Sequence, residues 1–162
     1  LALVEAVGGR PAAERPAGEL GVANWDARHR SAGFELTLEH KKTFIRNALT
    51  FWRRETVGIP LAEGVDEVAL GLLVDAYART NLASVVTLGA GGAPVVSRHG
   101  LTILPDRPGE SAGVDHLLSP PPTEAPAQTL ENELPVVAER YDLPTARIVA
   151  LVMEYPWAGG GR

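Results

Sequence analysis

The chain contains no cysteine. A chain without cysteine cannot form disulfides, thiolate metal sites or a cysteine nucleophile, and this lack suits a compartment on either side of the cell membrane. Long apolar runs are also missing. None approaches the roughly 18–20 residues that a helix needs to cross a bilayer, and no signal segment opens the sequence. We therefore expect a cytoplasmic chain without a membrane span.

Acidic residues outnumber basic ones, which gives a net charge of −5 and an isoelectric point near 5.4. A general nucleic-acid binder needs a basic face, so this balance disfavours nucleic acid as a partner. Hydrophobic residues make up 45% of the 162-residue chain, which is enough to form the core of one ordinary domain. The 17 glycines and 13 prolines predict many irregular connections.

Residues 1–55 are predicted to form a helical extension. Leu1–Gly21 has a helical apolar pattern that breaks once, at two adjacent glycines. Thr37 is a candidate N-cap for a stronger helix over Thr37–Glu55. Its apolar residues recur at helical spacing and are Leu38, Phe44, Ile45, Ala48, Leu49 and Trp52. Two interpretations of its basic residues stay open. In the first, the helix is a basic amphipathic helix that binds a membrane surface or a partner. In the second, the basic residues form a solvated face, and the apolar residues on the other side lie in the core.

Residues 56–162 alternate between strand and helix patterns. The predicted strands are Val57–Leu61, Ala83–Leu88 and Val114–Ser119, with a hairpin over Pro94–Leu104. The predicted helices are Asp66–Arg79, with Asp66 as N-cap, and Pro135–Tyr155, with a break near Pro144. This order predicts an α/β fold: a truncated three-layer sandwich with a mainly parallel, flavodoxin-like sheet, helices on its faces and the N-terminal helical extension.

The segment Gly64–Asp106 carries the most specific motifs. Gly64 opens the turn GVDE before a helix, and Pro94 opens the hairpin PVVSRHGLTILPD. The stretch VDHLLSP from Val114 follows as the next strand. These motifs resemble the first part of a DJ-1/PfpI (class I glutamine amidotransferase-like) domain. The closing helix Thr145–Pro156 is similar to the last helix of the same family.

Two features that the resemblance implies are missing. The family places a nucleophilic cysteine on a tight strand-to-helix elbow, but this chain has neither cysteine nor a G-x-S-x-G serine elbow. The family also places an acid five residues after the turn glycine, and Ala69 occupies that position. Asp66 and Glu67 cannot be assumed to replace it, because a shift of two residues rotates a side chain by about 200° around a helix. We therefore expect no catalytic residues in residues 56–162, a degenerate copy of the domain.

Two functions follow from this resemblance. The first is a non-catalytic DJ-1/PfpI-like module with a ligand-binding, regulatory or self-association role. The second is an enzyme of that superfamily, with hydrolase, glyoxalase-like or amidotransferase-like chemistry, whose catalytic cysteine lies outside this chain. The expected partners are a second copy in a homodimer or an upstream domain of the same polypeptide.

An ungapped alignment places Leu1–Gly21 over Leu134–Glu154. The identical pairs are Leu1/Leu134, Val4/Val137, Pro11/Pro144, Ala13/Ala146 and Ala17/Ala150. Two amphipathic helices can resemble each other by composition alone. The alternative is that both segments are closing helices of DJ-1/PfpI-like domains. In that case a preceding copy of the domain would lie upstream of Leu1.

Candidate ligand or interaction residues fall in three places. They are Trp25, Asp26, Arg28 and His29 in one loop, Asp66 and Glu67 at a helix start, and His99 in the hairpin turn. A loop with an aromatic ring and both charge signs suits ligand binding. The four histidines share no metal-ligand spacing, so we expect no metal site, and we expect no cofactor.

Overall fold

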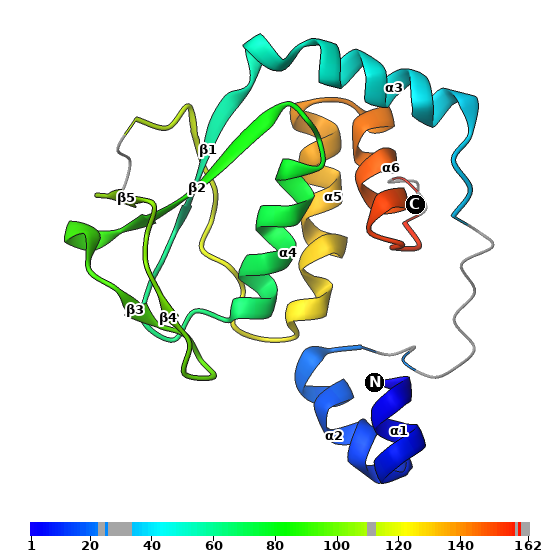
Figure 1. The fold of residues 1–162 in the computed structure, drawn as a ribbon, viewed down its shortest axis with the longest axis vertical. Coiled ribbons are helices and arrows are strands. Elements are labelled where there is room, and N and C mark those ends of the chain that lie inside the picture. The colour runs from blue at the N-terminus through cyan, green and yellow to red at the C-terminus, as the bar shows by residue number, and fades with distance from the viewer. Residues whose placement is uncertain (23–24, 26–33, 110–112, 158, 160–162) are drawn as a thin grey trace.

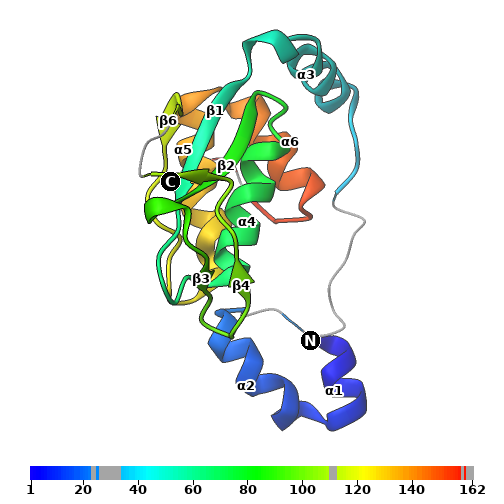
Figure 2. The same ribbon diagram turned by 60° about the vertical axis from the view of Figure 1, so that its left-hand side comes forward.

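A computed structural model describes residues 1–22, 25, 34–109, 113–157 and 159 of the chain. Four strands form its main sheet: β1 (Glu55–Pro60), β2 (Ala83–Gly89), β5 (Arg107–Pro108) and β6 (His116–Leu117). Their order is β5-β2-β1-β6, and every pair is parallel (Figures 1 and 2). The predicted α/β class with a mainly parallel, flavodoxin-like sheet is confirmed. Among the described residues, no helix is long and apolar enough to cross a membrane.

The centre of the sheet is the strand β1, which has neighbours on both sides. Its Val57 and Ile59 are fully buried, as expected for a β-branched run inside a parallel sheet. Gly58 lies between them because any side chain there would collide with Leu88 and Val114. The predicted third strand is shorter than expected, since only residues 116–117 of Val114–Ser119 pair with β1.

The helix α4 (Glu67–Ala78) connects β1 to β2 and packs beside the sheet (Figure 1). It begins where predicted, because the Asp66 carboxylate accepts hydrogen bonds from the backbone amides of Val68 and Ala69 at 3.0 and 3.1 Å. Its buried residues are Ala69, Leu70, Leu73, Ala76 and Tyr77.

The predicted hairpin forms a separate two-stranded sheet after β2 and the short helix η3 (Ala90–Gly92). Its strands β3 (Val95–Val96) and β4 (Thr102–Ile103) are antiparallel. Gly100 lies in the turn with a φ of 88°, a conformation that favours glycine. The Ser97 hydroxyl closes the turn by accepting a hydrogen bond from the Leu101 amide at 2.9 Å.

The C-terminal helices are α5 (Thr129–Arg140) and α6 (Leu143–Val152). The short helix η4 (Pro126–Gln128) precedes them. The break between α5 and α6 lies where predicted, and Asp142 caps α6 by accepting from the Thr145 amide at 2.7 Å. Leu134 and Val149 are fully buried where α5 and α6 pack on α4.

The N-terminal segment forms α1 (Ala2–Gly8) and α2 (Arg10–Leu20), which pack on each other. Gly9 separates them with a φ of 79°, so the predicted single break is confirmed. The two helices lie at the opposite end of the molecule from α3 (Leu38–Leu49) (Figure 2).

Two predictions about the helix α3 differ from the structure. It ends at Leu49, a 3-10 turn η2 (Phe51–Arg53) follows, and Glu55 already belongs to β1. The predicted apolar core face is wrong, because the buried residues of α3 are Thr43 and Asn47. The six apolar residues of the predicted face are all at least partly exposed. The physical reason is that α3 is attached to α6 and to the end of α4 through hydrogen bonds rather than through apolar packing.

Candidate functional site

Three residues predicted from the sequence meet at the carboxyl end of β1, which is where open α/β sheets usually bind ligands. The Nδ1 atom of His99 lies 2.8 Å from Oε1 of Glu67. The buried Asp66 carboxylate lies 3.7 Å from the guanidinium of Arg98, which also donates to the backbone oxygen of Thr123. The fold thus joins the start of α4 to the hairpin turn.

In this carboxyl-edge cluster each acid faces a basic side chain: Asp66 faces Arg98, and Glu67 faces His99. The pKa of Glu67 is lowered, first by a hydrogen bond from its own backbone amide and then by the side chains of His99 and Ser97. Glu67 is therefore a carboxylate at neutral pH. The described residues contain no group of three or more histidine, aspartate or glutamate side chains that could hold a metal ion.

The predicted loop site is only partly described. The guanidinium of Arg10 lies 5.5 Å from the centre of the Trp25 ring. This geometry is a cation–π contact with the neighbouring helix α2. Asp26, Arg28 and His29 lie outside the described residues, so their predicted role stays a prediction.

A cavity of about 660 Å³ opens at the other edge of the sheet, beside the start of β1. The residues that line it are Arg46, Asn47, Thr50, Arg53, Glu55, Leu82, Arg140, Tyr141 and Asp142. They come from α3, η2, the beginning of β1, the residue before β2 and the junction between α5 and α6. Its volume falls within the range of about 300–1,000 Å³ that is typical of small-molecule sites.

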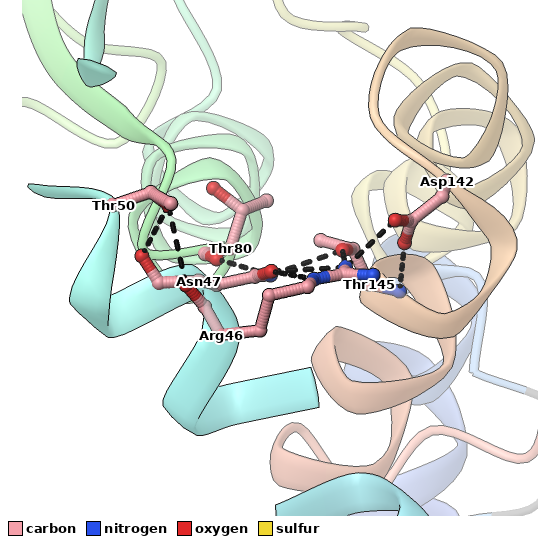
Figure 3. Close-up of polar contacts among 6 residues, drawn as sticks. All are labelled: Arg46, Asn47, Thr50, Thr80, Asp142 and Thr145. Atoms are coloured by element: carbon pink, nitrogen blue, oxygen red, sulfur yellow. Dashed lines mark hydrogen bonds and ion pairs between the residues drawn. The ribbon is translucent and has the colours of Figure 1, made fainter. Parts of the chain in front are cut away.

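One wall of this amino-edge cavity is the polar contact between α3 and α6 (Figure 3). Arg46 donates to the Asp142 carboxylate at 2.7 Å and to Oδ1 of Asn47 at 3.0 Å. The Asn47 amide nitrogen donates to the Thr80 carbonyl and to the Thr145 hydroxyl, both at 3.0 Å. The Thr50 hydroxyl donates to the Asn47 carbonyl at 2.8 Å.

The opposite wall is built around Glu55, the first residue of β1. Its carboxylate accepts hydrogen bonds from the guanidinium of Arg140 and from the hydroxyl of Tyr141. Burial raises the pKa of Glu55, but these two hydrogen bonds and the charge of Arg140 outweigh it, so the pKa lies below its ordinary value. Burial and the bond to Glu55 raise the pKa of Tyr141.

Both acids of the cavity are therefore ionised at neutral pH. Burial raises the pKa of Asp142, but its hydrogen bonds from Thr145 and the charge of Arg46 lower it below the ordinary value. Three guanidinium groups face two carboxylates, which leaves one positive charge. Arg53 provides it, because no acid of the described residues pairs with it. The cavity can therefore bind an anion, with the Arg53 guanidinium, which makes no ion pair among the described residues, as a hydrogen-bond donor.

The sequence alone did not indicate this cavity. Glu55 and Arg140 are 85 positions apart, and no local motif links them. The one available signal was the basic character of residues 41–54, which we noted as a possible interaction feature of the predicted helix. Only the folded chain brings that segment against the junction of α5 and α6.

Comparisons with known proteins add little. No family model matches the chain, and no curated protein matches it. Among solved structures it is similar to one titled "Crystal structure of VC2308 protein", with a TM-score of 0.37 and 17% identity over 64% of this chain. The chain spans 59% of the length of that protein. A likeness of this size carries no argument about function.

Proposed function

We propose that this chain is a non-catalytic DJ-1/PfpI-like module that binds a small anionic molecule in the amino-edge cavity. The observation that carries the proposal is the convergence of Arg46, Arg53 and Arg140 on one open cavity. The family likeness rests on the motifs of Gly64–Asp106, and the chain has no cysteine to act as the family nucleophile. A binding role, regulatory or otherwise, needs no such nucleophile.

The choice of the amino edge rests on the charges at the two edges. At the carboxyl edge, Arg98 faces Asp66 and donates to Thr123, and His99 faces Glu67. At the amino edge, Arg53 has no acidic partner among the described residues. An anion in the cavity is therefore attracted by a positive charge that no acid there neutralises. A carboxylate or a phosphate offers the planar or forked oxygens that guanidinium groups bind in pairs.

Isothermal titration of the chain with inorganic phosphate and with succinate tests this proposal. We expect one site for at least one of these anions, and we expect Arg53→Gln to weaken it by about tenfold or more, as for loss of one charged hydrogen bond. The matched control is Arg15→Gln, which removes an exposed arginine of α2 far from the cavity. Binding that is absent, or equally weakened by both substitutions, would contradict the proposal.

A second candidate function is an enzyme of the same superfamily whose cysteine comes from outside this chain. The contact between Glu67 and His99 favours it, because an ionised carboxylate holding a histidine at the carboxyl edge can take part in proton transfer. Assays of the isolated chain with methylglyoxal and with a peptide substrate test the non-catalytic module. Turnover by the isolated chain that is lost in Glu67→Gln would refute the non-catalytic module.

A further inference from the structure

The outward side of α3 is apolar, although the solvent side of a surface helix is normally polar. Leu38, Ile45 and Leu49 are 69%, 55% and 62% exposed. They lie nearly opposite Thr43 and Asn47, because each residue turns a helix by about 100°. The contact with α6 uses the polar side of α3, so the interpretation in which the apolar side lies in the core is excluded.

The turn η2, which follows α3, carries two more exposed apolar side chains, both of them aromatic. Phe51 and Trp52 are 62% and 69% exposed, and their rings meet edge to face with centroids 5.3 Å apart. We call these two residues, together with Leu38, Ile45 and Leu49, the outer α3 face. Five exposed large apolar side chains within residues 38–52 are a feature of the kind that marks an interaction surface.

Basic residues border the outer α3 face on both sides. Lys41 and Lys42 flank the line from Leu38 to Leu49, one on each side of it. Both are exposed, and no ion pair of the described residues involves them. Glu39 is the one acid of α3, and it lies to the side of this line rather than on it.

We infer that the outer α3 face binds the surface of an anionic lipid bilayer. A helix lying in the membrane interface has an apolar face with lysines along its flanks, and tryptophan and phenylalanine prefer the same depth. The helix α3 lies along the outer edge of the molecule, where it can meet a flat surface (Figures 1 and 2). A protein partner would instead have to provide a hydrophobic groove for α3.

The overall charge of −5 does not oppose this binding strongly. Charges further away than about 8 Å are largely screened at physiological salt, so the lysines beside the bilayer dominate. Each lysine near an anionic surface strengthens binding by about fivefold. The hydrocarbon contacts of Ile45, Leu49 and Trp52 then hold the helix at the interface.

Co-sedimentation of the full chain with phosphatidylcholine vesicles, with and without phosphatidylserine, tests the inference. We expect binding only to the vesicles that contain phosphatidylserine, with a blue shift of tryptophan emission. The double variant Lys41→Gln/Lys42→Gln should bind about 25-fold more weakly, and Ile45→Ser/Leu49→Ser should lose binding. Leu3→Ser/Val7→Ser is the control, because it removes exposed apolar side chains from α1 at the other end of the molecule.

All of these side chains are exposed, so each variant is expected to keep the melting temperature of the parent chain. Three results would overturn the inference. They are absence of binding to phosphatidylserine vesicles, equal loss of binding in the Leu3/Val7 control, and light scattering that shows a dimer which Ile45→Ser/Leu49→Ser dissociates. The last result would assign the outer α3 face to a second copy of the chain.

Discussion

Asn47 attaches α3 to the rest of the protein through a side chain that is only 3% exposed. Its amide nitrogen donates to Thr80 and Thr145, and its amide oxygen accepts from Arg46. The periodicity of apolar residues could not predict this role, because it assumes that the apolar side of a helix faces the core. A polar residue that satisfies its hydrogen bonds inside the protein looks the same in sequence as a solvated one.

We predict that Asn47→Ala lowers the free energy of unfolding by about 1–3 kcal/mol, because it leaves the buried Thr80 carbonyl without this donor. Urea unfolding measures the change. Asn132→Ala serves as the control, since Asn132 is exposed on α5 and its loss should change stability little. Equal stability of the Asn47→Ala variant and the parent chain would mean that these hydrogen bonds make no net contribution to the free energy of unfolding.

At the scale of elements, the pair Glu55–Arg140 connects the start of β1 to the end of α5. The pKa of Glu55 is lower in the folded chain than its ordinary value of 4.5. Because the pKa of this acid is lowered by folding, the pair contributes its full stabilisation at pH values above the ordinary pKa. That contribution is lost as pH falls through the lower, folded value.

We therefore predict that the melting temperature falls on acidification from pH 4.5 downward, and that Glu55→Gln lowers it at neutral pH and flattens this acid dependence. Thermal unfolding followed by circular dichroism between neutral pH and about pH 3 measures both effects. Glu139→Gln is the matched control, because it removes an exposed acid from the same helix, next to Arg140. If Glu55→Gln and Glu139→Gln shift the profile alike, the pair does not connect the two elements energetically.

Elements with local signals were predictable from the sequence. The N-cap Asp66, the strand over Ala83–Leu88 and the hairpin turn at His99 each depend on neighbouring residues, and each was located correctly. The end of α3 was not predicted correctly. The chain changes to 3-10 geometry after Thr50, and the spacing of the apolar residues does not show this change. The orientation of α3 depends on Asp142 and Thr145, which lie almost 100 positions away.

At the scale of the whole molecule, the parallel sheet followed from the alternation of strands and helices. The position of Asp66 and Glu67 at the carboxyl edge could be predicted for the same reason, because residues after β1 must lie at that edge. The amino-edge cavity was not, since it needs the extension over residues 38–53 to fold back against the α5–α6 junction. That arrangement is a property of the tertiary structure rather than of any segment.

The most direct test of the anion-binding module is a phosphate and succinate titration of the isotopically labelled chain, followed by amide chemical shifts in NMR spectra. We expect shifts that saturate and that concentrate at Thr50–Arg54 and Arg140–Asp142, around the amino-edge cavity. Shifts concentrated at Asp66, Glu67 and His99 would assign binding to the carboxyl edge instead. Such shifts, or the absence of saturable shifts with either anion, would contradict the account.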